Sequence, residues 1–155
     1  PALPRPNCLL VRGDVCDKAS IAAVLQHHAI DTILHLAGQT SVDLSFEDPL
    51  LFQRDNVQGT TTLLEACRSL PTLRLFLYCS TDEVYGGVRE GLSRESDPML
   101  PANPYSAAKA ACEHIVMAFH RSYGLPVIIT RTCNMYGRNQ YPEKVIPRFI
   151  LLAAG

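Results

Sequence analysis

The chain has 155 residues, of which 47% are hydrophobic and 19% charged, a composition typical of a globular domain and not of a disordered segment. Its net charge of −1 gives no basic surface for nucleic acid or for an anionic membrane. No stretch approaches the roughly 20 apolar residues that a membrane-spanning helix needs, and residues 1–6 lack a signal-peptide pattern. We therefore expect a cytoplasmic protein with no membrane or nucleic-acid partner.

The chain contains six cysteines and five histidines, but they do not follow a metal-binding pattern. No C-x-x-C or H-x-x-x-H occurs, and the cysteine spacing is irregular. We expect buried free thiols that pack as small hydrophobic groups, and no metal site. The pair His27-His28 lies near a predicted helix end and is interpreted as a surface or packing feature.

The N-terminal third alternates apolar runs with a helical pattern. Residues 8–12 form a candidate strand, and a turn follows. Asp17 can cap a helix in which apolar residues recur at helical spacing. Residues 32–36 are the next predicted strand, and Ala37 and Gly38 lie at its end.

A second helix is predicted over residues 49–69, because the Asp48 carboxylate can cap its free amides and Pro49 fits its first turn. Gly59 lies within this helix, where glycine costs about 1 kcal/mol relative to alanine. This cost suggests that another group packs closely against the backbone there, either a neighbouring element or a cofactor. Residues 73–80 form a continuous apolar strand of the kind buried on both faces.

The C-terminal half begins with a long irregular stretch, residues 81–102, that is rich in glycine and proline. Asn103-Pro104 repeats the pattern of a capping residue followed by proline, and predicts a helix over residues 104–122. The remaining predicted elements are a strand at 125–130, a loop at 134–142 and a helix from 143 onward.

Alternating strands and helices predict an α/β fold with a doubly wound, parallel, Rossmann-like sheet. A dinucleotide-binding fold normally begins with a strand and a glycine-rich turn, and this chain has no G-x-G-x-x-G. We therefore expect residues 1–155 to form a single partial NAD-binding domain that lacks the first strands and the C-terminal substrate domain.

The residues with the clearest chemical meaning are Thr81, Asp82 and Glu83 at a strand end, followed by Tyr105 and Lys109. Ligands of open α/β sheets bind at the carboxyl ends of the strands. Tyr105 and Lys109 are four residues apart on a predicted helix and share a face. An ammonium group beside a phenol favours the phenolate, so we expect a lowered tyrosine pKa and a catalytic base.

Each of these motifs is weak alone: Tyr-x-x-x-Lys occurs by chance, and adjacent acids are usually solvated turn residues. Together they resemble the dTDP-glucose 4,6-dehydratases of the extended short-chain dehydrogenase/reductase family. The resemblance is carried by segments 80–86 (STDEVYG), 103–109 (NPYSAAK) and 131–147, and it extends over nearly all of the chain from Gly13 onward. The Thr-Asp-Glu triplet is specific to sugar-nucleotide 4,6-dehydratases, since epimerases and decarboxylases of the superfamily usually lack the acid pair.

The resemblance implies a mechanism in three stages with NAD as cofactor. Tyr105, assisted by Lys109 and Thr81, deprotonates the C4 hydroxyl while hydride leaves C4. Glu83 then removes the C5 proton, and Asp82 protonates the departing C6 hydroxyl. Hydride finally returns to C6 and gives a 4-keto-6-deoxy sugar.

The resemblance also implies binding residues, for each of which a cap or turn role is the alternative. The cofactor-binding set is Asp14, Val15, Leu36, Ala37, Gly38, Tyr105, Lys109 and Asn134. The substrate-binding set is Asp43, Ser45, Asn56, Thr81, Asn134, Glu143 and Lys144. The implied substrate is dTDP-glucose or UDP-glucose, and the implied assembly is a homodimer through helices 49–69 and 104–122.

Two alternatives remain open at this point. The chain could be a truncated, inactive isoform or pseudoenzyme that retains only a dimerisation surface, or it could belong to a sugar-nucleotide 4-epimerase. We expect the 155-residue segment alone to be inactive, because the first strands would supply the helix N-terminus that binds the pyrophosphate.

Overall fold

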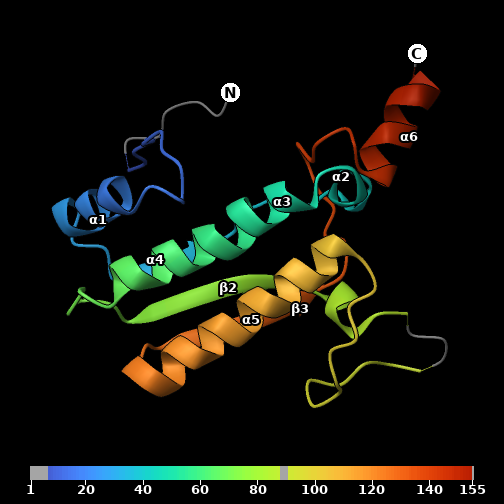
Figure 1. The fold of residues 1–155 in the computed structure, drawn as a ribbon. Coiled ribbons are helices and arrows are strands. Elements are labelled where there is room, and N and C mark those ends of the chain that lie inside the picture. Colours follow the sequence, from blue (N-terminus) through green and yellow to red (C-terminus); the bar gives the residue numbers. More distant parts are fainter. Residues whose placement is uncertain (1–6, 88–90, 155) are drawn as a thin grey trace.

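The computed structural model describes residues 7–87 and 91–154 (Figure 1). The strands β1 (Thr32–His35), β2 (Leu75–Thr81) and β3 (Val127–Thr132) form one sheet in the order β1-β2-β3. The helices, in chain order, are α1 (Lys18–His27), α2 (Val42–Glu47), α3 (Pro49–Phe52), the π-helix η1 (Gln53–Gln58), α4 (Gly59–Cys67), the 3-10 helix η2 (Asp82–Tyr85), α5 (Pro104–Tyr123) and α6 (Val145–Ala154).

Both strand pairs are parallel, which confirms the predicted Rossmann-like α/β sheet. Leu34 pairs with Leu77, and Thr81 pairs with Thr132 at the far end of β2. Parallel strands bring their carboxyl ends to one edge, so the residues that follow β1, β2 and β3 lie at the same edge of the sheet.

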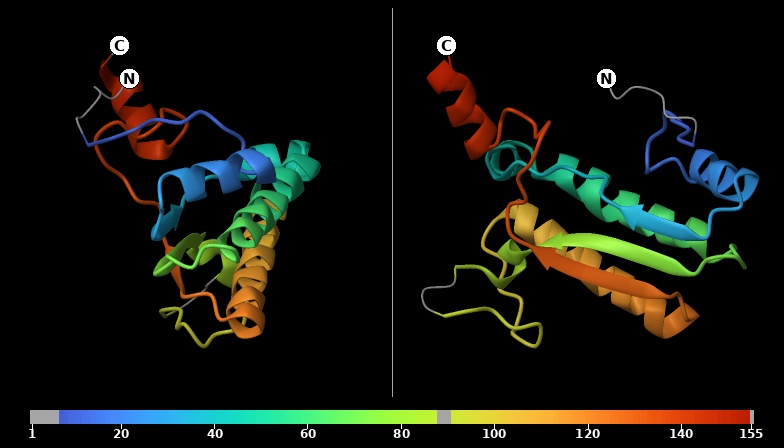
Figure 2. Two further views of the ribbon diagram at one scale, coloured as in Figure 1. Left: turned by 90° about the vertical axis from the view of Figure 1, so that its left-hand side faces the viewer. Right: turned by 180° about the vertical axis from the view of Figure 1, so that it is seen from behind.

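Helices α4 and α5 cover one face of this sheet (Figure 2). The fully buried Phe76 and Tyr78 of β2 point into this core. On the other face Leu34 and Ile128 are 60% and 49% exposed. The expectation that β2 is buried on both faces is therefore wrong for the described residues, because burial alternates between intermediate and buried from Leu75 to Ser80.

Three of the four predicted helix starts are confirmed by side-chain caps, and the helix expected from residue 143 begins at Val145. Each capping oxygen accepts a backbone N–H three residues later: Asp17 from Ser20 at 3.1 Å, Asp48 from Leu51 at 3.1 Å and Asn103 from Ser106 at 2.7 Å. Asparagine and aspartate satisfy amides that have no partner within the helix. Gly124, in the left-handed conformation (φ 71°), ends α5.

The predicted helix over residues 49–69 is continuous in space but contains the π-helical turn η1. Gly59 follows this turn, and a Cβ atom at Gly59 would lie 2.6 Å from Cγ2 of Val15. The close packing inferred from this glycine is therefore present, with Val15 as the neighbour.

Some predicted boundaries were wrong. Residues 8–12 do not form a strand: Leu9 and Leu10 are 68% and 86% exposed, without a described neighbouring strand to pair with. The strands predicted at 73–80 and 125–130 begin two residues later than expected. Helix α2 was not predicted, and its start is capped by the Ser41 hydroxyl, which accepts the Leu44 N–H at 3.3 Å.

Two sequence predictions concern residues outside the described ranges. These are the irregular stretch at residues 88–90 and the lack of a signal-peptide pattern in residues 1–6. Within the described ranges, no helix combines the length and apolar character needed to cross a membrane. The same ranges contain no cluster of three or more histidine, cysteine or acidic side chains suited to a metal. Helix α6 extends from the body of the molecule (Figure 1), with Phe149 and Leu152 at 65% and 70% exposure.

The cysteines are free, as expected, but only some are buried. Cys67 and Cys112 lie in the core, whereas Cys8 and Cys133 are exposed. The prediction of buried thiols therefore fails for Cys8, which lies outside the sheet, and for Cys133, because β3 ends one residue before it.

Candidate active site

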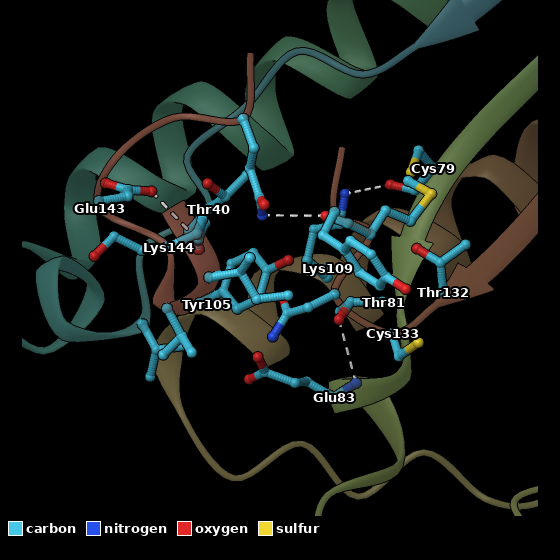
Figure 3. A pocket seen from close by; sticks show the side chains of 18 of the residues that line it. Thr40, Cys79, Thr81, Glu83, Tyr105, Lys109, Thr132, Cys133, Glu143 and Lys144 are labelled. Carbon is cyan, nitrogen blue, oxygen red and sulfur yellow. Dashed lines mark hydrogen bonds and ion pairs between the residues drawn. The ribbon is translucent and has the colours of Figure 1, made fainter. Parts of the chain in front are cut away.

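A cavity of about 620 Å³ lies at the carboxyl edge of the sheet (Figure 3). Its walls come from the ends of β2 and β3, the first turns of α5, the segment 40–43 and residues 132–148. Four of the five predicted catalytic residues line it: Thr81, Glu83, Tyr105 and Lys109. The end of β2 and the helix α5, whose residues here are 22 or more positions apart in the sequence, therefore meet around one space.

Helix α5 holds Tyr105 and Lys109 on one face, four residues apart. The Tyr105 ring packs edge-on against Phe52, with 6.2 Å between ring centroids. The Lys109 ammonium donates to the carbonyl oxygen of Cys79 at 2.5 Å and lies 4.4 Å from the centroid of the Tyr78 ring. Both contacts fix the charge of Lys109 beside the end of β2.

Burial dominates the protonation of both groups. It raises the pKa of Tyr105, a shift that the nearby Thr81 hydroxyl opposes and the negative charge of Glu83 reinforces. Burial also lowers the pKa of Lys109, since desolvation disfavours its charged form. The pKa of Tyr105 is therefore raised, opposite to the lowering that was expected from its lysine neighbour.

The two acidic residues of the turn η2, Asp82 and Glu83, have different surroundings. Thr81 begins this turn, and its hydroxyl oxygen accepts the Glu83 N–H at 3.3 Å. The same hydroxyl donates to a carboxylate oxygen of Asp82 at 3.3 Å. Glu83 is half-buried and lines the cavity, whereas Asp82 is exposed and is absent from its lining within the described ranges.

The Glu83 carboxylate is held by Asn103, for which the sequence predicted only a helix-capping role. Its Oε2 atom accepts a hydrogen bond from Nδ2 of Asn103 at 3.1 Å. Asn103 precedes the helix that carries Tyr105 and Lys109. This bond therefore joins the acid-bearing turn to the helix of the proposed base.

Five further predicted binding residues line the same cavity: Leu36, Asp43, Asn134, Glu143 and Lys144. The Lys144 ammonium pairs with Glu143 at 3.3 Å and donates to the carbonyl oxygen of Thr40 at 3.0 Å. These two residues lie across the cavity from Thr81 and Lys109 (Figure 3).

A second cavity of about 340 Å³ contains three of the predicted cofactor residues: Asp14, Val15 and Gly38. Its wall also includes Arg54, which pairs with Asp14 and, at 2.8 Å, with Asp55. The Asp14 pKa is lowered by the backbone N–H of Cys16 and by the charge of Arg54. Neighbouring residues of the segment 36–40 line the two cavities: Leu36 and Thr40 the larger, and Gly38 and Gln39 the smaller.

Three predicted binding residues line neither cavity: Ala37, Ser45 and Asn56. Ser45 is fully buried, and its hydroxyl donates to the Val42 carbonyl at 2.6 Å. Asn56 is 2% exposed; its amide accepts from N–H of Gln39 at 2.7 Å and donates to the Gln39 carbonyl at 3.1 Å. Ser45 and Asn56 therefore support the fold around residues 36–45 in this structure.

A side-chain cluster outside the cavity lining was not predicted from the sequence. Arg131 of β3 pairs with the buried Glu113 of α5 at 2.7 Å and donates to the Tyr85 hydroxyl at 2.6 Å. Its guanidinium also lies 4.7 Å from the centroid of the Tyr85 ring. Spacing along the sequence gives no sign of this cluster, because its members belong to three different elements.

A parallel Rossmann-like sheet with a Tyr-x-x-x-Lys helix and an acid-bearing turn at its carboxyl edge defines the extended short-chain dehydrogenase/reductase class. The family model for GDP-mannose 4,6 dehydratase matches residues 2–155, and the chain belongs to this family.

The chain is also similar in sequence to individual 4,6-dehydratases. The chain is 50% identical over 156 residues to a trifunctional UDP-glucose 4,6-dehydratase/UDP-4-keto-6-deoxy-D-glucose 3,5-epimerase/UDP-4-keto-L-rhamnose-reductase of Arabidopsis thaliana, covering 99% of this chain and 24% of that protein. It is 45% identical over 148 residues to the dTDP-D-glucose 4,6-dehydratase of Homo sapiens, covering 96% of this chain and 42% of that protein.

The fold agrees with that of a solved dehydratase. DesIV, a dTDP-glucose 4,6-dehydratase from Streptomyces venezuelae solved with NAD and TYD bound, superposes with a TM-score of 0.91 at 42% identity, covering 97% of this chain and 47% of that chain. The chain therefore spans less than half the length of each of these proteins.

Proposed function

We propose that this chain is the catalytic part of an NAD-dependent sugar-nucleotide 4,6-dehydratase. The observation that carries the proposal is the meeting of Thr81, Glu83, Tyr105 and Lys109 around one cavity (Figure 3). Dehydration between C5 and C6 needs a group that removes the C5 proton, and Glu83 is an acid placed beside the Tyr-x-x-x-Lys helix. A 4-epimerase has no use for such a base, so this acid favours dehydration.

Each residue has one task in the proposed reaction. Tyr105 takes the C4 hydroxyl proton, aided by the Thr81 hydroxyl and by the fixed positive charge of Lys109. Glu83 takes the C5 proton, which is acidified by the new C4 ketone. Asp82, on the same turn, gives a proton to the departing C6 oxygen, which leaves as water.

The residues at the sheet edge fit an NAD molecule that extends along both cavities. Gly38 has φ +146° and passes so close to Asn56 that a Cβ atom would lie 2.7 Å from its Oδ1, a turn that only glycine accepts. The Ser80 hydroxyl, in the wall of the larger cavity, is buried with no hydrogen-bond partner among the described residues. When bound, NAD would accept hydride from C4 and return it to C6. Asp14, Val15 and Leu36–Gly38 would lie along it, with Asn134 at the larger cavity.

The sugar nucleotide would occupy the larger cavity, where Asp43, Asn134, Glu143 and Lys144 offer polar contacts. Lys144 supplies a positive charge for a diphosphate, and Glu143 a hydrogen-bond acceptor for hydroxyl groups. We propose dTDP-glucose or UDP-glucose as substrate. Ser45 and Asn56 would act indirectly, by holding the segment that borders this space.

In this proposal residues 1–155 form one part of the NAD-binding domain. The absence of disulfides among the described cysteines suits a reducing compartment, which favours the cytoplasm. Homodimerisation through the helices at 49–69 and 104–122 is also proposed, because both carry exposed side chains, Gln58 in η1 and Ala118 in α5. Ala118→Arg in the complete protein would then shift its sedimentation from dimer to monomer.

A product assay tests the proposed activity. Full-length protein, meaning a polypeptide that contains these 155 residues together with the flanking parts found in the relatives, is incubated with NAD and either dTDP-glucose or UDP-glucose. We expect a 4-keto-6-deoxy sugar and no net change in reduced cofactor. An epimerised sugar that retains its C6 oxygen would instead identify an epimerase.

The same assay separates catalysis from a dimerisation-only role. The 155-residue chain alone is expected to be inactive, because it has no glycine-rich turn for the pyrophosphate. If the full-length protein were also inactive and still formed dimers, the chain would belong to a pseudoenzyme.

A further inference from the structure

The side-chain amide of Asn103 is engaged at both of its ends. Its Oδ1 atom accepts the backbone N–H of Ser106 at 2.7 Å, and its Nδ2 atom donates to Oε2 of Glu83 at 3.1 Å. The Ser106 hydroxyl in turn accepts the backbone N–H of Asn103 at 3.2 Å, which completes a capping box.

This arrangement fixes the orientation of the amide. The Ser106 N–H can only donate, so the oxygen of the Asn103 amide must face the helix. A flipped amide would place two donors against each other there and an oxygen against the Glu83 carboxylate. The amino group is therefore directed at Glu83 by the same contact that begins α5.

We propose that Asn103 is a positioning residue. Its side-chain amide holds the Glu83 carboxylate in the cavity, at a fixed position relative to Tyr105 and Lys109 on α5. The proposal rests on the proposed dehydratase function and adds a residue to it. Serine and aspartate also cap helices well, but aspartate has no proton to donate, and the hydroxyl of serine would lie where Asn103 has its Cγ atom, one bond short of the Nδ2 position that reaches Glu83.

The surroundings of Glu83 make this donor important. Asp82 lies beside it on η2, Tyr105 and Lys109 face the cavity from α5, and Glu143 and Lys144 lie across it. Arg131 of β3 reaches the same turn at Tyr85, but Glu113 already neutralises its charge. Asn103 is thus a neutral partner that can hold the carboxylate without neutralising it.

Two cap-preserving variants of the full-length protein test the proposal. Asn103→Ser keeps the cap but shortens the side chain, so that no donor remains at the Nδ2 position, whereas Asn103→Asp keeps the cap and replaces the donor with a second carboxylate. The first step, oxidation at C4, is followed in single turnover by the transient absorbance of reduced cofactor. The second step is followed by incorporation of solvent deuterium at C5 and by release of the 4-keto-6-deoxy product.

For Asn103→Ser we expect dehydration to slow by about ten- to a hundredfold, the effect of losing a hydrogen bond to a charged group. Oxidation at C4 should stay within about threefold of the parent protein, because α5 keeps its cap. For Asn103→Asp we expect a similar loss and, in addition, an acidic limb of the dehydration pH profile displaced upward by about one pH unit or more, since a second nearby carboxylate disfavours ionised Glu83.

Asp17→Asn, an exchange of capping residue at α1, is the matched control and should leave both steps unchanged. If Asn103→Ser and Asn103→Asp leave C5 exchange and the pH profile unaltered, Asn103 is only a cap and the inference is overturned. The same conclusion follows if both steps and the melting temperature fall together. Absence of product from the parent protein would overturn the proposed function itself, an outcome distinguishable from either of these.

If Asn103→Asp does not fold, a double variant tests the link: in protein that already carries Glu83→Gln, Asn103→Ser should cause no further loss of the residual C5 exchange. Additive losses in Asn103→Ser and Glu83→Gln would contradict a direct link between the two residues.

Discussion

The guanidinium of Arg131 in β3 and the carboxylate of Glu113 in α5 form a two-point ion pair. The Nε atom of Arg131 lies 3.0 Å from both carboxylate oxygens, and its Nη2 atom lies 2.7 Å from Oε2. Glu113 is 3% exposed. Because Arg131 also donates to the Tyr85 hydroxyl, this pair connects β3, α5 and the acid-bearing turn η2.

Removal of Arg131 should destabilise the protein strongly. Arg131→Met would leave the Glu113 charge buried and unpaired, at a cost of about 3–5 kcal/mol in the free energy of unfolding. Urea denaturation of the full-length protein measures this loss. Arg74→Met is the control: its pair with Asp31 is long (3.5 Å) and exposed, so it should cost less than about 1 kcal/mol. Equal losses in the two variants would show that the buried pair has no special role.

His35 should make stability depend on pH. It is 3% exposed, and its Nε2 atom lies 2.9 Å from the Thr60 hydroxyl. Burial, and secondly the charge of Lys109, lower its pKa to about 4. The unfolded chain binds this proton at higher pH than the folded chain does. The contribution is therefore fully present above pH ~6.5 and is lost as the pH falls toward ~4, by at most about 3 kcal/mol.

The His35 contribution is measured as the difference in unfolding free energy between pH ~7.5 and pH ~5. His35→Gln, which can still bond Thr60 but does not titrate, should show a smaller difference than the parent protein. The same pH dependence in both proteins would assign the effect to other groups.

The cysteines should differ sharply in their reactivity toward an alkylating reagent. Cys133 and Cys8 are exposed and should react first, whereas Cys67 is buried and burial raises its pKa to about 12. Peptide mass spectrometry gives the rate at each thiol. Because Cys133 lines the larger cavity, NAD with a sugar nucleotide should slow its reaction and leave Cys8 unaffected. Unchanged labelling of Cys133 would contradict binding at this cavity.

Two substitutions should separate the chemical steps. Tyr105→Phe removes the proposed base for the C4 hydroxyl and should reduce formation of reduced cofactor by about 10²–10⁴-fold. Glu83→Gln should permit oxidation at C4 but block exchange of the C5 proton with solvent. If solvent exchange at C5 were normal in the glutamine variant, Glu83 would have been given the wrong role.

Much of the fold could be predicted because its signals are local. Asp48-Pro49 and Asn103-Pro104 marked helix starts correctly, since a capping side chain and a proline act within one turn of the backbone. Residues 8–12 were predicted wrongly because an apolar run forms a strand only where its backbone can pair with a neighbouring strand. Local sequence pattern does not reveal whether such a strand lies beside it.

Only part of the candidate site could be predicted in this way. Tyr105 and Lys109 are one helical turn apart, so their common face follows from spacing. The Asn103–Glu83 contact spans 20 positions and the Arg131–Tyr85 contact 46, and both depend on how η2 packs against the sheet. Asn56 matched a substrate position by resemblance, but in the structure its amide is fully used by the backbone of Gln39.

The fate of the C4 hydrogen tests the proposed reaction most directly. Full-length protein is incubated with NAD and dTDP-glucose or UDP-glucose that carries deuterium at C4, and the product is analysed by NMR. A 4,6-dehydratase moves this deuterium to C6 and gives a 4-keto-6-deoxy sugar labelled in its methyl group. Deuterium that returns to C4, in a sugar that keeps its C6 oxygen, would contradict dehydration at this site.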